Sequence, residues 1–485
     1  MPEPSFLFHD YETFGADPRR DRPSQFAAIR TDVEFNQIGE PEVIYCRQAD
    51  DYLPHPQACL ITGITPQRAN RRGLPEAEFA ARIQALMSVP GTCSLGYNTL
   101  RFDDEVSRHL FYRNLLDPYG REWQNGNSRW DLIDAVRTFY ALRPQGIEWP
   151  MREDMEGRKV PSFKLEQLTA ANGIEHVGAH DALSDVRATI SLARLLRERN
   201  AKLFDYLLGL RDKHRVKALL DVDSRKPMIH VSRRYPAAQG CSALVAPLAR
   251  HPSNPNGVIV CDLSADPEPL LALSAEEIRA RVFVSRAELA EGLERIPLKV
   301  VQVNRSPALL PVKALDESAA ARLGIDRERS ESHWQRLAQV EGLAAKVAEV
   351  FAEPPPEGST DPDLMLYSGS FFSSSDKRAM AEVHQHLGWD LVGLNPMFQD
   401  ARLPEMLFRM RARSYPETLE GADREHWDQL RWERFNSPQL SSLTLQGFAR
   451  EIERLNREPL SERDRQLLEE LVMHVEAIMP PQAFE

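Results

Sequence analysis

The sequence predicts an α/β protein of about three domains. Its 485 residues exceed the roughly 150 residues of one ordinary domain about threefold. The pattern of apolar residues also changes twice along the chain. Strand-like and helix-like patterns alternate to about residue 200, and short β-type runs follow to about 350. Helical spacing dominates from about 375. We therefore expect domains at 1–200, 201–352 and 356–485, with a linker in the proline-rich segment 353–359.

The first domain is predicted from alternating strands and helices. Apolar runs that predict strands occur at residues 6–8, 26–29, 42–46 and 92–97. Residues 76–87 have helical spacing, with Phe79, Ile83 and Leu86 on one face, and a further helix follows through 106–111. Strands followed by mixed helices and strands predict an α/β or α+β layer.

The second and third domains have different patterns. Short β-type runs separated by turn-rich segments occur at 227–231, 243–246, 258–261 and 298–303. They predict a small β-barrel or sheet that carries helical insertions. The last part of the chain is largely helical and rich in Arg, Glu and Leu, without a recognisable internal repeat.

Composition narrows the class of protein. Lys and Arg number 60 and Asp and Glu 72, a net charge of −12, which argues against a protein that coats polyanions through bulk charge but not against a local basic cleft. The five cysteines form no C-x-x-C pair, as expected of reduced packing residues in the cytoplasm. We find no signal peptide, no apolar run near the roughly 18 residues of a membrane span, no G-x-G-x-x-G and no P-loop. We therefore expect a soluble cytoplasmic protein without a membrane partner.

Two carboxylates follow the first predicted strand. Asp10 and Glu12 flank Tyr11, and residues i and i+2 of a strand point to one face. Their charges repel unless a cation lies between them, and oxygen ligands of this kind suit Mg²⁺ or Mn²⁺. For an isolated D-x-E pair, a strand that ends in a solvated loop is the more common explanation.

A third carboxylate lies on the apolar face of a predicted helix over 182–199. Asp185 falls at i+3 from Ala182 and i−4 from Thr189, within the stripe that should pack against the domain. A carboxylate there is costly unless a metal ion or a buried arginine neutralises it. Five residues earlier lies His180, a residue type that acts as a base near neutral pH or stands as an ordinary loop histidine.

Further acidic residues occur in the segment 101–105, Arg-Phe-Asp-Asp-Glu, at a predicted helix start. Acidic residues there favour the helix dipole, and one of them is also a candidate metal ligand. In order, the chain therefore carries a strand with D-x-E, an Asp near 100, and H-x-x-x-x-D at a helix start near 180.

This ordered set resembles the DEDD superfamily of 3′→5′ exonucleases, in the subclass marked by H-x-x-x-x-D. Longer stretches are similar to the bacterial exodeoxyribonuclease I family: 9–15, 25–32, 60–66, 96–98, 101–105 and 127–131. The similarity is close over the first 200 residues, recognisable to about 350 and looser beyond. It implies a ribonuclease-H-like exonuclease domain, then an SH3-like barrel and a C-terminal helical domain.

The resemblance also implies a site and a reaction. Asp10, Glu12, Asp103 and Asp185 would hold two Mg²⁺ ions, with Mn²⁺ possible in their place, and His180 would be the general base. The implied reaction is processive hydrolysis of single-stranded DNA from its 3′ end to 5′-mononucleotides, in DNA repair and recombination.

The resemblance further implies residues that contact DNA. Besides Glu12, these are Lys164, Arg108, Tyr119, Trp123 and Arg137, and Lys164 stands where relatives usually carry Arg. Four arginines of the last domain are candidates for the DNA groove or for a solvated helix face: Arg402, Arg409, Arg411 and Arg413. The family also implies a monomer that binds the acidic tail of single-stranded DNA-binding protein.

Two alternatives stay open. An RNA-trimming exonuclease of the same superfamily would need only one catalytic domain of about 200 residues, which is shorter than this chain. A non-catalytic single-stranded DNA-binding scaffold would be expected to have lost part of the metal set, whereas all four carboxylates and His180 are present.

Overall fold

The computed structural model describes residues 3–176, 178, 181–284, 288–352 and 358–484. It divides into two compact units that interleave along the chain. The first unit consists of Met1–Ser128, Val177–Arg187 and Pro356–Glu485, and the second of Arg129–His176 and Ala188–Pro355. The C-terminal helices therefore belong to the same unit as the first strands.

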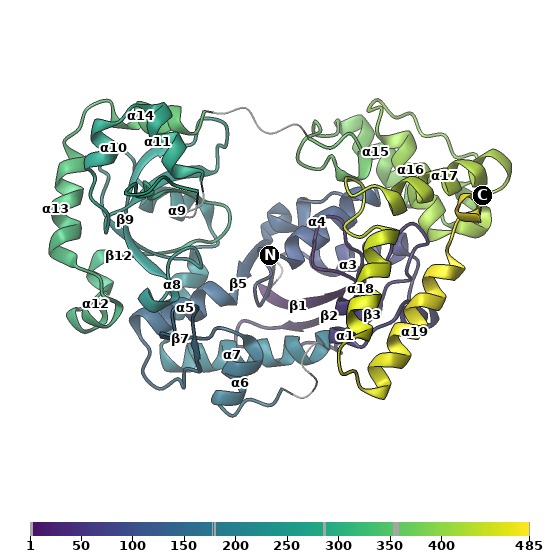
Figure 1. The fold of residues 1–485 in the computed structure, drawn as a ribbon, viewed down its shortest axis with the longest axis horizontal. Helices are drawn as coiled ribbons and strands as arrows, with labels where there is room; N and C mark the ends of the chain where they lie inside the picture. The colour runs from purple at the N-terminus through teal and green to yellow at the C-terminus, as the bar shows by residue number, and fades with distance from the viewer. Residues whose placement is uncertain (1–2, 177, 179–180, 285–287, 353–357, 485) are drawn as a thin grey trace. The chain divides into compact units, whose positions relative to one another are not determined.

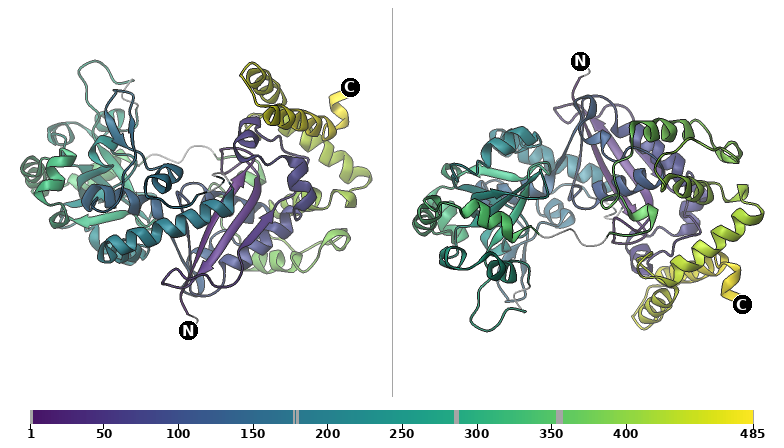
Figure 2. Two further views of the ribbon diagram at one scale, coloured as in Figure 1. Left: turned by 90° about the horizontal axis from the view of Figure 1, so that it is seen from below. Right: turned by 90° about the horizontal axis from the view of Figure 1, so that it is seen from above.

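The first unit contains a mixed sheet. Its strands are β1 (Ser5–Thr13), β2 (Pro23–Thr31), β3 (Glu42–Tyr45) and β4 (Thr92–Gly96), in the order β3-β2-β1-β4. β2 is antiparallel to both β1 and β3, whereas β4 is parallel to β1. The long strands β1 and β2 run side by side in Figure 2. The four strands predicted from the sequence are thus confirmed.

Two helices cover one face of this sheet. They are α3 (Glu76–Met87) and α4 (Asp103–Arg113), which lie next to the strands in Figure 1. Phe79 of α3 and Leu110 of α4 are fully buried in one core with Tyr11 of β1. Because side chains alternate along a strand, Asp10 and Glu12 lie on the opposite face from Tyr11. The packing of α3 and α4 thus leaves the carboxylates on the other side of the sheet.

The C-terminal helices complete the first unit. The remaining helices of this unit are α1 (Pro56–Thr62), α2 (Pro66–Arg72), α15 (Ser374–Val383), α16 (Leu403–Ser414), α17 (Gly421–Asn436), α18 (Leu445–Asn456) and α19 (Glu462–Ala477). One core joins Phe14 and Cys59 to Phe435 and Leu471, and α18 and α19 lie against α1 (Figure 1). A second core joins Tyr112 to Met406 of α16.

A buried ion network also connects the C-terminal helices to the strands and helices of the first 128 residues. Asp363, 4% exposed, accepts hydrogen bonds from Arg434 at 2.7 Å, Arg413 at 2.9 Å and Arg409 at 3.3 Å. Arg413 lies 3.7 Å from Glu76, which starts α3. The negative charges of the carboxylates and the positive charges of the arginines therefore neutralise one another in a region shielded from water.

The sequence analysis placed four arginines at or near α16 either in a DNA groove or on a solvated helix face. Both predictions are wrong for three of the four. Arg409, Arg411 and Arg413 are at most 8% exposed, so they form neither a solvated helix face nor an open groove lining. Arg411 pairs with Asp423. Half-buried Arg402 pairs with Asp400 at 2.7 Å and donates to the Tyr112 hydroxyl at 3.0 Å. Arg409 and Arg413 pair with the distant Asp363, whereas Arg402 and Arg411 pair with carboxylates nearer in the sequence.

The second unit contains a five-stranded antiparallel sheet in the order β11-β10-β9-β8-β12. Its strands are β8 (Met228–Val231), β9 (Ser242–Arg250), β10 (Gly257–Asp262), β11 (Leu298–Gln302) and β12 (Ala308–Pro311), and a separate hairpin pairs β6 (Met151–Glu153) with β7 (Lys159–Pro161). Its helices are α5 (Leu132–Leu142), α6 (Leu165–Ala171), α8 (Ala201–Gly209), α9 (Lys213–Leu219), α10 (Glu268–Ala272), α11 (Ala275–Val282), α12 (Glu317–Leu323), α13 (Arg327–Ala338) and α14 (Leu343–Val350). The sequence predicted β8 to β11 and missed β12 and the β6–β7 hairpin.

Two elements cross the boundary between the units: β5 (Ser128–Asp131) and α7 (Ala182–Arg199). The predicted helix over 182–199 is confirmed with the same bounds. Among the described residues, no helix is both long and apolar enough to span a membrane.

Candidate metal centre

Strand β1 positions the first two carboxylates. Asp10 lies opposite Ala27 and Glu12 opposite Gln25 on β2, so both carboxylates project from the same face of a paired strand. Glu12 is 8% exposed and Asp10 is half-buried. Because pairing with β2 fixes the backbone of β1, it also fixes the face of the sheet from which these two side chains project.

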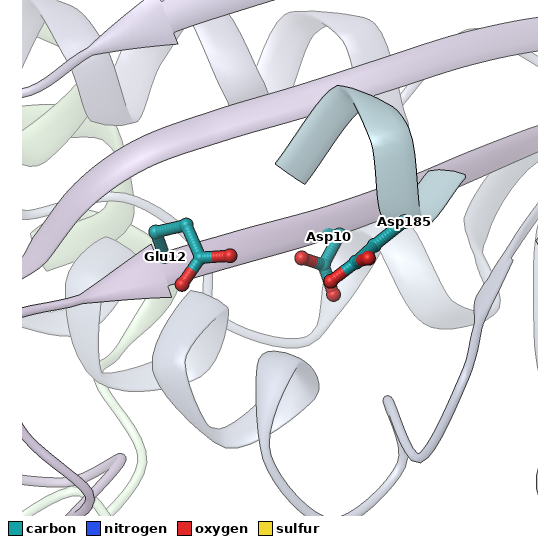
Figure 3. Close-up of side chains that lie close together, drawn as sticks. All are labelled: Asp10, Glu12 and Asp185. Carbon is teal, nitrogen blue, oxygen red and sulfur yellow. The ribbon is translucent and has the colours of Figure 1, made fainter. Parts of the chain in front are cut away.

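Helix α7 brings the third carboxylate to them. Asp185 lies in its first turn, between the buried residues Ala182 and Val186. Asp10, Glu12 and Asp185 each offer one oxygen within 4.8 Å of the others, a spacing that suits a shared metal ion. Figure 3 shows the carboxylates of this group, two from β1 and one from α7.

The fourth predicted carboxylate, Asp103, begins α4 and lies outside that three-residue group. Its Oδ1 accepts a hydrogen bond of 3.0 Å from the backbone N–H of Tyr11, between Asp10 and Glu12. Asp103 is 4% exposed, and its charge raises the pKa of both neighbours. The adjacent Asp104 instead forms a 2.6 Å ion pair with buried Arg121.

The electrostatics of this cluster favour a dication. Burial, and then the charges of Asp103, Glu12, Asp185 and Asp181, raise the pKa of Asp10 well above its usual value. Burial and the charges of Asp185, Asp103 and Asp181 raise the pKa of Glu12 to about 9. Without a cation the cluster therefore retains protons at neutral pH, and an incoming metal ion would displace them.

We expect Glu12→Gln to remove a pH-dependent loss of stability in the metal-free protein. Because the pKa of Glu12 is raised, the folded state holds this proton where the unfolded state releases it, so stability falls as pH rises from about 4.5 towards 9. Melting temperatures in EDTA at about pH 5.5 and 8.5 test this. The drop between the two pH values should be smaller for the variant than for wild type.

The matched control is Glu153→Gln, at an exposed position on β6. It should show the wild-type drop. Equal drops for wild type, Glu12→Gln and the control would contradict the raised pKa of Glu12.

Sequence reasoning missed one acidic neighbour of the cluster. Asp181 acts on both Asp10 and Glu12, and its Oδ1 accepts from the Ser184 N–H at 3.3 Å at the start of α7. The signal was available, since Asp181 precedes a predicted helix by one residue, as an N-cap residue does. The predicted base His180 lies outside the described residues.

The predicted DNA-contacting residues of the first unit occupy different environments. Arg108 is 5% exposed, and its guanidinium forms a two-bond pair with Glu122 at 2.7 and 2.9 Å and a 3.0 Å bond to Glu105. It lies over the ring of half-buried Tyr119, 5.5 Å from the centroid. Trp123, by contrast, is 67% exposed. The ring of Trp123 is therefore open to a ligand, whereas the Arg108 charge already has partners.

An apolar pocket adjoins Tyr119. It encloses about 400 Å³, and its lining includes Tyr112, Tyr119, Phe371, Phe372 and Lys377. The Phe371 ring meets Tyr119 edge-on at 6.2 Å and is nevertheless 85% exposed. This site therefore offers aromatic faces and one exposed cation, which suits nucleobases and phosphate.

The other two predicted contacts lie in the second unit. Arg137 is 7% exposed, pairs with Asp134 at 2.6 Å and lies over the Phe163 ring. The Lys164 side chain is 67% exposed and lies 3.7 Å from Glu166, a distance at which an exposed pair holds it weakly. Lys164 is therefore free to contact a phosphate, whereas Arg137 is held within its own helix.

Three family models match successive parts of the chain. They describe an exonuclease over residues 7–193, an exonuclease I SH3-like domain over 211–353 and an exonuclease I C-terminal domain over 360–478. The chain is 48% identical to exodeoxyribonuclease I of Escherichia coli (strain K12) over 98% of both chains. It is 46% identical to exodeoxyribonuclease I of Haemophilus influenzae over 93% of both.

Solved structures give the same result. Exonuclease I of Methylocaldum szegediense matches with a TM-score of 0.93 at 50% identity, covering 98% of this chain and all of that one. E. coli exonuclease I in complex with a dA16 oligonucleotide matches with a TM-score of 0.93 at 48% identity and the same coverage. A zinc-bound form of the E. coli exonuclease I complex with single-stranded DNA matches with a TM-score of 0.91 at 47% identity.

The mixed sheet with converging carboxylates defines a ribonuclease-H-like exonuclease domain, and an SH3-like domain and a C-terminal helical domain follow it. More narrowly, the chain belongs to the exodeoxyribonuclease I family. The resemblance seen in the sequence is thereby confirmed.

Proposed function

We propose that the protein is a divalent-metal-dependent exodeoxyribonuclease that hydrolyses single-stranded DNA processively from its 3′ end and releases 5′-mononucleotides. The observation that carries this proposal is the group Asp10, Glu12 and Asp185, in which three carboxylates from two elements approach within 4.8 Å, with Glu12 buried and the other two half-buried. Family membership supports the substrate, because a relative named exodeoxyribonuclease I matches over 98% of the chain.

The proposed site holds two Mg²⁺ ions through Asp10, Glu12, Asp103 and Asp185. The raised pKa values of Asp10 and Glu12 support the fit, because such clusters are stable in ionised form only beside positive charge. Oxygen-only ligands favour Mg²⁺ or Mn²⁺ over softer metals. Bound dications would stabilise the attacking and leaving oxygens of a phosphodiester displacement.

The chain's own residues perform the remaining steps. His180 accepts a proton from the attacking water, whose oxygen forms a bond to the 3′-terminal phosphorus. The bond from that phosphorus to the 3′ oxygen of the preceding nucleotide breaks. This oxygen takes up a proton from water, and His180 releases its proton to the solvent. In this proposal Glu12 also binds the DNA substrate. Lys164 is a further substrate-contacting residue.

The proposal extends to partners and organisation. A cytoplasmic monomer would act on single-stranded DNA in repair and recombination and bind the acidic tail of single-stranded DNA-binding protein. The domain boundaries proposed for it are 1–200, 201–352 and 356–485. Structures of E. coli exonuclease I in complex with oligonucleotides support the DNA part of this proposal.

Digestion of end-labelled oligonucleotides tests the function. With Mg²⁺ and a 5′ label, single-stranded DNA should shorten stepwise from its 3′ end, while duplex DNA and RNA of the same sequence stay largely intact. Preferential degradation of RNA would show that the proposed substrate is wrong and would leave the proposed reaction standing. Tight binding without cleavage under every metal condition would instead indicate a scaffold.

We expect Phe371→Ala to weaken the binding of single-stranded DNA. The exposed ring borders the pocket beside Tyr119, and stacking of one base on an aromatic side chain contributes about 1–3 kcal/mol. The KM for a long oligonucleotide should therefore rise about tenfold, with little change in kcat. Trp389→Ala is the control, since Trp389 is 57% exposed and does not line the pocket. Equal KM values for both variants and wild type would remove Phe371 from the DNA path.

A further inference from the structure

Gln25 connects the sheet to the start of α7. Its side chain is 1% exposed on β2, and its Oε1 accepts a hydrogen bond of 3.3 Å from the backbone N–H of Ala182, the first residue of α7. The first N–H groups of a helix have no acceptor within the helix. Because Ala182 is fully buried, water is not available to this donor, and Gln25 takes that place.

The position of Gln25 on the sheet gives this bond a functional meaning. Gln25 lies directly opposite Glu12 in the β1–β2 register, and cross-strand partners project from the same face. Its neighbour Phe26 packs with Tyr11 in the core on the other face. The Gln25 side chain therefore emerges on the carboxylate face, beside Glu12, and spans from there to α7.

Ala182 stands between two residues of the proposed site. It follows His180 by two positions and precedes Asp185 by three. Two other bonds at this helix start are local: Ser184 N–H donates to Asp181 Oδ1, and Asp185 N–H donates to the Asp181 carbonyl. The bond from Gln25, in contrast, comes from the sheet. It therefore fixes this turn relative to β1 and β2.

The chemistry of the side chain also matters. A glutamine offers a carbonyl acceptor without a charge. A glutamate would offer the same acceptor but would add a carboxylate to a cluster in which Asp10 and Glu12 already have raised pKa values. A neutral acceptor of this length therefore joins the helix to the sheet without competing for the metal.

From this geometry we infer that Gln25 is a positioning residue for the metal site: through Ala182 it sets where Asp185 stands relative to Asp10 and Glu12. The inference rests on the proposed metal-dependent function and deepens it. Gln25 itself touches neither the metal nor the DNA in this account.

Direct binding of Mn²⁺ to the full-length protein, measured by calorimetry without DNA, tests the inference. Gln25→Met preserves the length of the side chain and removes the oxygen acceptor. It should weaken Mn²⁺ binding about tenfold, as loss of an outer contact to a metal site does. In assays with single-stranded DNA, the metal concentration for half-maximal rate should rise equally, with the KM for DNA unchanged.

Two further variants control for folding. Ser24→Ala alters the fully buried neighbour on the opposite face of β2 and should bind Mn²⁺ as wild type does. Gln25→Asn retains the amide on a side chain one methylene shorter, and it should show the same loss as Gln25→Met. If Gln25→Met does not fold, Gln25→Asn decides.

The outcomes separate this inference from the proposed function. Wild-type Mn²⁺ affinity in a folded Gln25→Met or Gln25→Asn variant would overturn the positioning role alone. Absence of Mn²⁺ binding by the wild-type protein would overturn the proposed metal-dependent function.

Discussion

Asp185→Asn is expected to lower kcat for single-stranded DNA by about 10³-fold or more, because metal-assisted charge stabilisation contributes several kcal/mol to such reactions. The substitution preserves the shape of the side chain and removes one of the three carboxylates that approach within 4.8 Å. It also relieves the like-charge repulsion that raises the pKa of Glu12. The folded protein should therefore be at least as stable as wild type when metal is absent.

Rates under single-turnover conditions and melting temperatures in EDTA check this expectation together. Asp205→Asn is the matched control, since Asp205 is 58% exposed and pairs loosely with Arg197 near the end of α7. Its rate should equal that of wild type. A rate for Asp185→Asn within tenfold of wild type would remove Asp185 from the metal site, whatever the stability of the variant.

Asp363→Asn is expected to destabilise the first unit by about 3 kcal/mol or more, the usual cost of removing one partner from a buried ion pair. Asp363 receives hydrogen bonds from three arginines, Arg409, Arg413 and Arg434, each at most 8% exposed. Those arginines hold the pKa of Asp363 well below its usual value. An asparagine would leave positive charge buried and undercompensated between α16, α17 and the start of α3.

The midpoint of urea unfolding, followed by intrinsic fluorescence, measures this effect. The variant should unfold at a distinctly lower urea concentration. Asp266→Asn removes a partner from the exposed pair with Arg336 and should leave the midpoint unchanged. A midpoint for Asp363→Asn equal to that of the control would show that other carboxylates suffice for the three arginines.

Local patterns made part of this structure predictable. The apolar run at 6–8 predicted β1, and the apolar stripe over 182–199 predicted α7. Period-two geometry placed Asp10 and Glu12 on one face, and the position of Asp185 within an apolar stripe signalled a carboxylate in need of a cation. Each of these inferences concerns residues close together in sequence.

Contacts between distant segments were less accessible. Arg409 and Arg413 carry no sequence mark that separates a solvated charge from a buried one, because their partner Asp363 lies about 50 residues away. The environment of Arg108 depends in part on Glu122, which lies 14 residues later, beyond the helix that holds Arg108 and Glu105. Strand β12 was missed because its few apolar residues are too short a run to show a period.

The most direct test of the central proposal is the metal dependence of nucleotide release from single-stranded DNA. Wild-type protein incubated with a uniformly labelled oligonucleotide and Mg²⁺ should release labelled 5′-mononucleotides, and a 5′-labelled copy should shorten stepwise from its 3′ end. Release should stop with EDTA and resume with excess Mg²⁺, and Asp185→Asn should show none under the same conditions. Release that continues undiminished in EDTA, or in Asp185→Asn, would contradict a reaction that depends on metal ions held by these carboxylates.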